Sequence, residues 1–123
     1  MKTIEINALV LAYLGDTIYE NYVRKYLIEN GIANVNDLQK ESIKYVSAKG
    51  QAEYLKKMME NNFFNPDELD IIKRARNTKS NSSSKGCDII TYKYATGLES
   101  LIGFLEIERN KARIDEIMSF ILK

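Results

Sequence analysis

The spacing of the apolar residues limits the fold of this chain more than any other feature. Over most of its 123 residues, apolar side chains recur at helical intervals, and no long stretch alternates apolar and polar residues as a half-buried strand does. The chain has one proline, Pro66, which stands where a helix can begin. This pattern predicts an all-α fold.

Helix start and stop signals divide the first half of the chain. We expect a long first helix from Asn7, a good N-cap, to about Glu29, with Gly31 as its C-terminal stop. A second helical stretch is expected to begin at Asn36, and Gly50 is the point at which it could break in two. The first half should therefore contain two or three helices.

The second half has clearer boundaries. Residues 65–76, NPDELDIIKRAR, open with an asparagine cap, a proline and two acids in the first turn, which is a strong helix start. Residues 77–88, NTKSNSSSKGCD, predict a loop. A long helix is expected over residues 91–108, and Asn110 should cap a final short helix. The core face of the long helix is predicted to contain Leu98, Leu101, Ile102 and Leu105.

The first predicted helix is apolar on most of its sides. One face is expected to contain Val10, Leu14, Ile18 and Tyr22. This face is widened by Leu9, Tyr13, Tyr19, Val23 and Leu27. Such a helix should be buried, in the core or against a second subunit. Asp16 interrupts the apolar surface, and because a buried carboxylate is costly without a partner, Asp16 either faces solvent or has one.

Two absences exclude whole classes of catalytic chemistry. The chain has no histidine, which excludes Ser-His-Asp triads, Cys-His dyads and histidine metal sites. Its one cysteine, Cys87, excludes an intramolecular disulfide and a cysteine-rich zinc site. An enzyme with this sequence must use carboxylates, lysines, tyrosines or a metal.

A basic segment is concealed by the near-neutral net charge of +1. Residues 73–93 carry six lysines and arginines against one acid, so the rest of the chain sums to −4. Lysine and arginine attract phosphates, and the serines and asparagines of this segment can bond phosphate oxygens. The same composition also suits a solvated loop after a basic helix end.

The sequence predicts a cytoplasmic protein with no membrane segment. The N-terminal apolar run lacks the basic region and the cleavage site of a signal peptide. No apolar run approaches the roughly 20 residues that a membrane-spanning helix needs.

Two stretches resemble a known family. Residues 11–20, LAYLGDTIYE, resemble the signature helix of the ribonuclease III family, whose pattern centres on Leu-Gly-Asp and falls here on residues 14–16. Residues 95–107, ATGLESLIGFLEI, resemble the family's later catalytic helix, in which a glutamate, here Glu99, precedes Leu-Ile-Gly. Gly15 and Gly103 in these stretches are expected to permit close helix–helix approach, which tight packing without catalysis would explain equally well.

The resemblance is closer still to the short, Mini-ribonuclease III branch of the family. It extends through YVSAKGQA at 45–52, RARNTKS at 74–80 and YKYATGLESLIG at 92–103. Because it covers almost the whole chain, we expect residues 1–123 to form a single catalytic domain without a separate double-stranded-RNA-binding domain. The short branch implies that the basic segment replaces that domain, with RNA contacts from Arg74, Arg76, Asn77, Lys79, Ser80 and Lys85.

The resemblance implies a homodimeric, all-helical endoribonuclease that cleaves double-stranded RNA with Mg²⁺, for which Mn²⁺ can substitute. Asp16 and Glu99 match the two acidic positions that hold the catalytic metal, and Glu20, one turn after Asp16, is a further candidate ligand. With no histidine, metal-bound water is the best source of the attacking group, which leaves 5′-phosphate and 3′-hydroxyl products. The implied substrate is the precursor of 23S ribosomal RNA, whose ends are trimmed.

Three departures from the longer enzymes keep other functions open. Further acids of those enzymes fall here on Leu9, Ala12 and Thr96. One alternative is therefore a non-catalytic dimeric RNA-binding or scaffold protein on the same fold, and a more distant one is a helical protein–protein module. The intact pair of Asp16 and Glu99 favours the enzyme over both.

Overall fold

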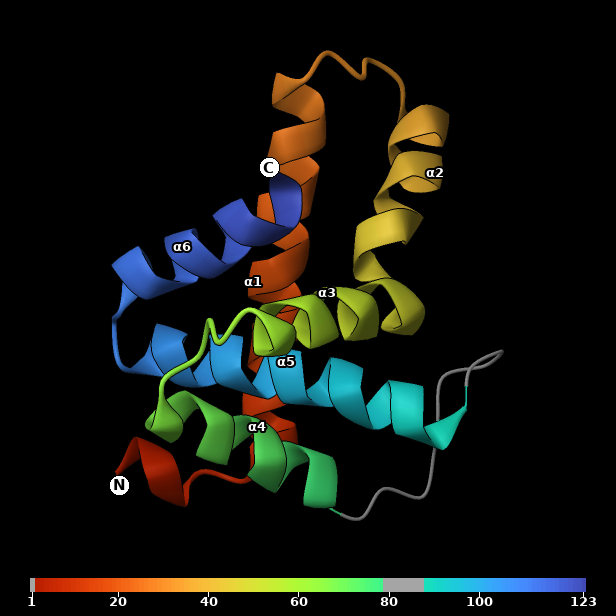
Figure 1. The fold of residues 1–123 in the computed structure, drawn as a ribbon. Helices are drawn as coiled ribbons and strands as arrows, with labels where there is room; N and C mark the ends of the chain where they lie inside the picture. The colour runs from red at the N-terminus through yellow and green to blue at the C-terminus, as the bar shows by residue number, and fades with distance from the viewer. Residues whose placement is uncertain (1, 79–87) are drawn as a thin grey trace.

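All regular structure in the computed structural model, which describes residues 2–78 and 88–123, is helical (Figure 1). The elements are a short 3₁₀ helix η1 (Thr3–Glu5) and the α-helices α1 (Ala8–Glu29), α2 (Val35–Val46), α3 (Ala48–Glu60), α4 (Pro66–Asn77), α5 (Ile89–Ile107) and α6 (Lys111–Leu122). The predicted all-α class is confirmed. No helix within the described ranges is both long and apolar enough to cross a membrane.

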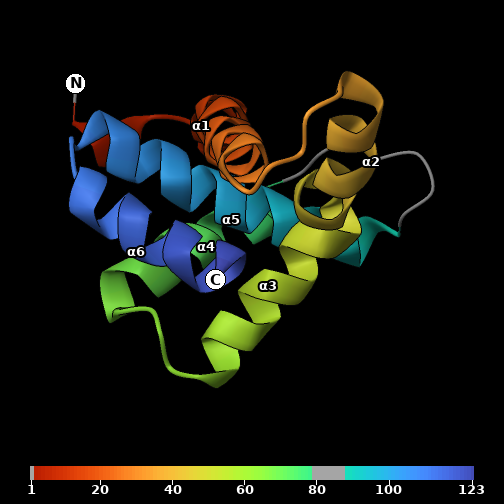
Figure 2. The same ribbon diagram turned by 90° about the horizontal axis from the view of Figure 1, so that it is seen from above.

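Helix α5 lies at the centre of the molecule. It crosses α1 steeply, and α3, α4 and α6 pack around it (Figures 1 and 2). The side chains predicted to form its core face are all buried, namely Leu98, Leu101, Ile102 and Leu105. The apolar core therefore surrounds α5, and α5 fixes the positions of the helices that cross it.

The boundaries of α1 follow the predicted signals. The Asn7 side chain accepts a hydrogen bond from the backbone N–H of Leu9 at 2.8 Å. At the other end Gly31 has φ +92°, in the left-handed region that glycine adopts without a steric penalty. The N–H of Gly31 bonds the carbonyl of Ile28, and the N–H of Ile32 bonds the carbonyl of Leu27. These bonds satisfy two carbonyls that the helix end leaves free.

Two predicted boundaries in the next stretch are wrong by a few residues. Helix α2 begins at Val35, because the Asn34 side chain rather than Asn36 accepts the capping bond, from Asp37 N–H. The break between α2 and α3 falls at Ser47, whose hydroxyl caps α3 by accepting from Gly50 N–H. Gly50 itself is helical. Its backbone lies so close to α2 that an added Cβ would be 2.2 Å from the Lys44 carbonyl oxygen.

The later boundaries are nearly as predicted. Helix α4 has the expected capping box between Asn65 and Glu68. Helix α5 begins two residues before the predicted start, because the Asp88 side chain accepts from Thr91 N–H and caps it. Asn110 caps α6 as expected. The predicted loop 77–88 is described only at its ends, where Asn77 closes α4 and Asp88 caps α5.

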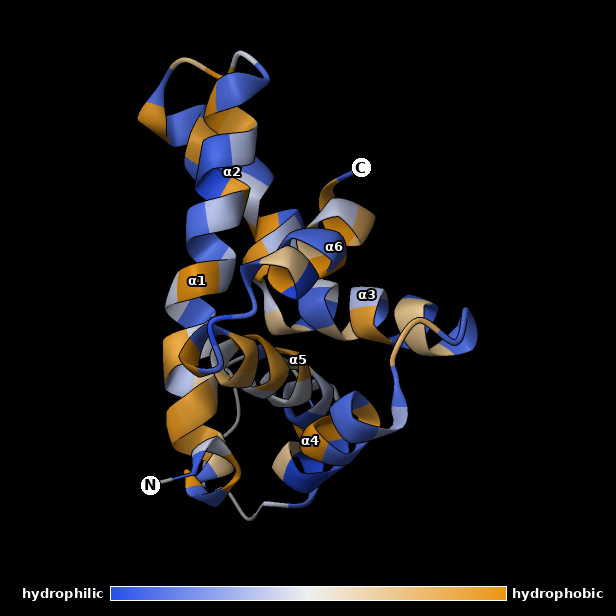
Figure 3. Ribbon diagram, turned by 90° about the vertical axis from the view of Figure 1, so that its left-hand side faces the viewer, coloured by the Kyte–Doolittle hydropathy of each residue, from blue (hydrophilic) through white to orange (hydrophobic). Residues whose placement is uncertain are grey.

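The predicted apolar face of α1 is correct only for the residues that widen it, of which Tyr19, Val23 and Leu27 are buried. None of Val10, Leu14, Ile18 and Tyr22 is buried, and Val10 is 57% exposed. The buried side instead contains Ala8, Leu11, Ala12, Gly15, Tyr19, Val23 and Leu27. Gly15 lets the backbone of α5 approach this side closely. As a result the N-terminal half of α1 keeps apolar residues on its outer side, where it is largely orange in Figure 3.

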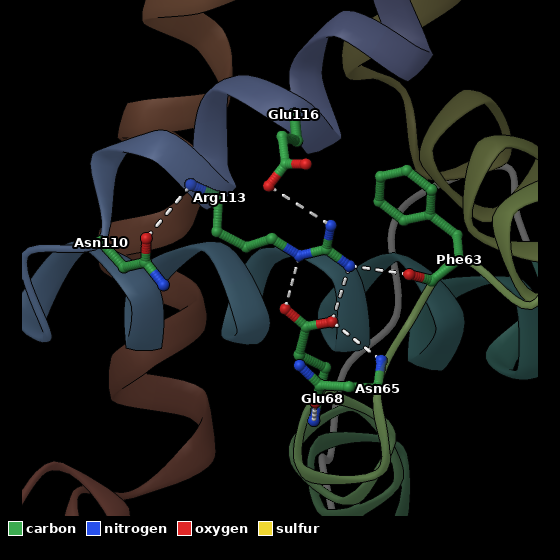
Figure 4. A network of polar contacts seen from close by, with 6 residues as sticks. All are labelled: Phe63, Asn65, Glu68, Asn110, Arg113 and Glu116. Carbon is green, nitrogen blue, oxygen red and sulfur yellow. Dashed lines mark hydrogen bonds and ion pairs between the residues drawn. The ribbon is translucent and has the colours of Figure 1, made fainter.

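A buried ion pair ties α6 to α4 (Figure 4). The Arg113 guanidinium donates to both carboxylate oxygens of Glu68, at 2.7 and 2.9 Å, and to the carbonyl of Phe63 at 2.7 Å. Its carbon Cζ lies 4.5 Å from the centre of the Phe63 ring. The hydrogen bonds of Glu68 raise the pKa of Arg113. This contact fixes the far side of the bundle, away from the α1–α5 crossing.

Candidate active site

Two glycines form the crossing of α1 and α5. A Cβ on Gly15 would lie 1.7 Å from the carbonyl oxygen of Glu99, and a Cβ on Gly103 would lie 1.9 Å from the carbonyl oxygen of Leu11. Real Cβ atoms do not come so close, so only glycine fits at either position. The expected close approach at Gly15 and Gly103 is confirmed.

This crossing brings the two predicted catalytic acids together. Asp16 follows the glycine that touches the Glu99 backbone, and its carboxylate lies within hydrogen-bonding range of the Glu99 side chain. Asp16 is exposed and Glu99 is half-buried. Burial, followed by the hydrogen bond and negative charge of Asp16, raises the pKa of Glu99 from 4.5 to about 9. Glu99 therefore favours its protonated form near neutral pH, beside Asp16.

A pair of carboxyl groups that retains a proton in this way is also suited to a metal cation. The cation would replace the proton and offset the repulsion between the two acids. Mg²⁺ prefers oxygen ligands, keeps several waters and binds through one or two carboxylates together with substrate phosphate. Asp16 and Glu99 supply that minimum from two different helices.

Glu20 lies one turn beyond Asp16 on α1, and its charge contributes to the raised pKa of Glu99. Its side chain is 39% exposed and lies 3.8 Å from the Arg24 guanidinium. Within residues 2–78 and 88–123 no group of three or more acids, cysteines or histidines is close enough to hold a metal. A direct role for Glu20 as a metal ligand stays a prediction.

Sequence reasoning missed Gln51 as a site residue. Gln51 is on α3, is 2% exposed, and donates from Nε2 to Oε2 of Glu99 at 3.4 Å. The only signal was its place in YVSAKGQA, one of the stretches that carried the family resemblance. Its contact depends on the packing of α3 against α5, which the sequence pattern does not reveal.

The predicted RNA-binding residues at the end of α4 have different surroundings. The Arg74 guanidinium donates to the backbone carbonyls of Ile4 and Ile6, so it anchors the N-terminal segment. The Arg76 guanidinium lies over the Tyr94 ring, with Cζ 4.8 Å from the ring centre. Asn77 is exposed. The other three predicted contacts, Lys79, Ser80 and Lys85, lie outside the described residues.

A second cation joins Arg76 at the same ring. Lys56 of α3 places its Nζ 5.0 Å from the centre of the Tyr94 ring. Three helices therefore contribute to a cluster of Lys56, Arg76 and Tyr94, which we call the cationic cluster. Sequence periodicity did not indicate that Lys56 belongs with the basic segment, because it lies on a different helix.

Comparison with known proteins decides the family. The model of the Ribonuclease III domain family matches residues 9–110, which include both acids and both crossing glycines. The chain belongs to the ribonuclease III family. Membership confirms the resemblance found in the sequence and the expected class of enzyme, an endoribonuclease.

Relatives in this family match the chain over most of their own length. Mini-ribonuclease 3 of Brevibacillus brevis is 46% identical over 112 residues, which make up 91% of this chain and 82% of the relative. Mini-ribonuclease 3 of Acholeplasma laidlawii is 43% identical over 119 residues and 94% of each chain. A crystal structure of a Fusobacterium nucleatum protein is 33% identical, covers 98% of each chain and has a TM-score of 0.89. The fold expected for a ribonuclease III domain is therefore confirmed.

Proposed function

We propose that this protein cleaves double-stranded RNA in a reaction that depends on Mg²⁺, with Asp16 and Glu99 as the catalytic metal ligands. The observation that supports this most strongly is the meeting of these two carboxyl groups at the glycine crossing of α1 and α5. Family membership supports the reaction class, and this geometry supports Asp16 and Glu99 as the acids that carry it out. Mn²⁺ is expected to substitute for Mg²⁺.

The protein's part in the reaction is to hold two negative oxygens in fixed positions. The crossing fixes the backbone on which both acids stand, so their side chains need little reorganisation when a cation binds. When bound, Mg²⁺ supplies a water of lowered pKa and offsets the charge that builds on the phosphate. Attack of water oxygen on phosphorus breaks the bond to the 3′ oxygen. The products therefore carry a 5′-phosphate and a 3′-hydroxyl.

For RNA contact we propose the C-terminal end of α4 and the cationic cluster. Duplex RNA is recognised mainly through its shape, phosphates and 2′-hydroxyls. Lys56 and Arg76 present two positive charges around one aromatic ring, and exposed Asn77 lies next to Arg76. Arg74 already binds two backbone carbonyls, and its contact with RNA, like that of Lys79, Ser80 and Lys85, stays a prediction.

We also propose that the protein is a homodimer that forms through the outer side of α1. Val10 is 57% exposed and Tyr13 is 82% exposed. These residues lie in the first half of the helix, where Figure 3 shows mainly apolar residues. Exposed apolar surface of this kind is typical of an interface.

The precursor of 23S ribosomal RNA is the substrate that we propose, and the cytoplasm is the expected location. Both follow from the short branch that the sequence resembles and from its Mini-ribonuclease 3 relatives. We further propose that residues 1–123 act as one catalytic domain. The RNA contacts would then come from the basic segment and the cationic cluster.

Replacement of Asp16 tests the catalytic assignment. Asp16→Asn keeps the size of the side chain but removes one of the two charges, so we expect cleavage of a duplex RNA in Mg²⁺ to fall by at least about 1,000-fold. The measurement is the single-turnover rate on an end-labelled duplex, with Glu108→Gln as a control for loss of one exposed acid elsewhere. Equal rates for wild type and Asp16→Asn would refute the site.

Replacement of Arg76 tests the RNA interface. If Arg76 contacts a phosphate, Arg76→Ala should weaken duplex binding to a similar extent for every sequence and lower the slope of log K against log salt by about 1. Lys40→Ala, which removes one exposed cation from α2, is the matched control and should leave the slope unchanged. Binding is measured by fluorescence anisotropy without divalent cation. An unchanged slope for Arg76→Ala would show that Arg76 does not contact an RNA phosphate.

One observation favours the alternative of a non-catalytic RNA-binding or scaffold dimer. The described residues contain a pair of acids, and no group of three that could hold a metal. The alternative predicts salt-sensitive duplex binding without cleavage in either Mg²⁺ or Mn²⁺. The single-turnover assay separates the two functions, because only the enzyme gives a product with a 5′-phosphate.

A further inference from the structure

Gln51 is a buried polar side chain whose amide nitrogen is directed at the catalytic pair. It is 2% exposed, and its Nε2 lies 3.4 Å from Oε2 of Glu99. A buried amide is costly unless it makes hydrogen bonds, so the position is unfavourable for glutamine without this contact. This distance is slightly longer than the usual N–H···O range of about 2.7–3.2 Å.

The surrounding helices hold Gln51 in place. Gly50, the residue before it, is in close backbone contact with the Lys44 carbonyl at the turn between α2 and α3. The Tyr19 hydroxyl of α1 donates to the Tyr45 carbonyl at 2.6 Å, which fastens the same turn to α1. The turn is thereby fastened to α1, and α1 contacts the Glu99 backbone at Gly15, so the Gln51 amide is held near Glu99.

The contact has a defined effect on the Glu99 carboxylate. An N–H donor favours the charged form of an acid, which is the form that binds a cation. The bond also uses one of the two carboxylate oxygens and so limits rotation of the group.

We propose that Gln51 is a positioning residue, which orients the Glu99 carboxylate for a divalent cation through an amide hydrogen bond from α3. The role rests on the proposed function of Asp16 and Glu99 as metal ligands. Gln51 itself contacts neither the cation nor the RNA. Its loss should weaken metal binding and slow the chemical step while it leaves RNA affinity unchanged.

The test compares Gln51→Met with wild type. Methionine has nearly the same length and volume but no N–H, so the packing of α3 is retained. Mn²⁺ affinity, measured by electron paramagnetic resonance of the free ion, should fall by about 10-fold to 100-fold, as is common when a group that supports a metal ligand is removed. The kcat for duplex cleavage should fall, and the KM for RNA should stay within about 2-fold of wild type.

Three further variants make the result decisive. Ser100→Ala removes a buried hydroxyl that has no partner among the described residues, and should leave Mn²⁺ affinity unchanged. Gln51→Asn keeps the amide but shortens it by one methylene, and a 5-fold or greater loss of affinity is expected even if Gln51→Met fails to fold. Asp16→Asn reports on the proposed function itself.

The outcomes are distinguishable. If Asp16→Asn loses Mn²⁺ binding but both Gln51 variants bind as tightly as wild type, the positioning role is overturned and the metal site stands. If Asp16→Asn binds Mn²⁺ like wild type, the proposed function fails and the role of Gln51 fails with it. A fall in melting temperature of Gln51→Met without a change in Mn²⁺ affinity would show that Gln51 is only structural.

Discussion

At the scale of single residues, the fold holds two acids, Asp16 and Glu99, so close together that they repel each other when both are charged. Glu99 is half-buried beside Asp16, and both burial and the neighbouring charge favour its protonated form. Glu20 adds to the same effect, and Gln51 opposes it. Without a metal, Glu99 reduces this repulsion by keeping its proton. A bound metal cation would displace that proton.

The raised pKa predicts how the stability of the metal-free protein depends on pH. Because folded Glu99 holds its proton more tightly than the unfolded chain does, it contributes stability that is complete below about pH 4.5 and is lost as the pH rises to about 9. In EDTA the melting temperature of wild type should fall more steeply from pH 5 to 9 than that of Glu99→Gln, which stays neutral. Saturating Mg²⁺ should remove the difference. If the melting temperatures of wild type and Glu99→Gln changed equally with pH in EDTA, the raised pKa would be contradicted.

At the scale of helices, glycine positions decide how closely α5 meets its neighbours. The crossing with α1 is a contact between backbones, at Gly15 and Gly103. Gly97 faces α4 less tightly, because its added Cβ would lie 3.1 Å from Cγ2 of the Ile72 side chain and 3.3 Å from the Ile72 backbone oxygen. The difference matters because a side chain can move by a few tenths of an ångström, whereas two packed helix backbones cannot separate without loss of the contacts around them.

A comparison of two alanine variants within α5 tests this account. Both substitutions gain the same helix propensity of about 1 kcal/mol, so the difference between them reports packing. Gly103→Ala should destabilise the protein by about 2–4 kcal/mol, and Gly97→Ala should be close to neutral. Urea denaturation followed by circular dichroism measures both free energies of unfolding. Similar values for the two variants would mean that the crossing can relax.

At the scale of the whole molecule, one side of α1 faces the core and the other is left apolar and exposed. The buried side contacts α5, while Val10 and Tyr13 face outward. A second subunit that covers this surface would bury both. It would also place the first half of α1 close to the interface, on the same helix as Asp16.

The proposed dimer can be tested with a pair of matched valines. Val10 and Val35 are 57% and 65% exposed, and each lies in the first turn of its helix. Val10→Asp places a charge in the proposed interface and should raise the dimer Kd by about 100-fold or more. Val35→Asp on α2 should leave it unchanged. Sedimentation velocity across a range of concentrations measures both, and a monomeric wild type or a dimeric Val10→Asp would contradict the interface.

The sequence by itself determined most of the helices and the family. Asn7, Gly31, Asn65 and Asn110 were sufficient to place helix ends because capping is local chemistry, which acts within one turn of the cap. The two motifs, at residues 11–20 and 95–107, indicated the reaction class and the acids Asp16 and Glu99. The starts at Asn34 and Asp88 were missed because neighbouring polar residues are equally good caps by composition, and only the backbone selects one.

The tertiary structure decided which side of α1 is buried and what surrounds Glu99. The apolar pattern of α1 covers most of its circumference, so periodicity could not choose a face. The choice follows from the close backbone contacts of Gly15 with Glu99 and of Leu11 with Gly103, between residues far apart in the chain. Gln51 and Lys56 acquire their partners in the same way, because α3 packs on α5 and brings side chains together that no local pattern connects.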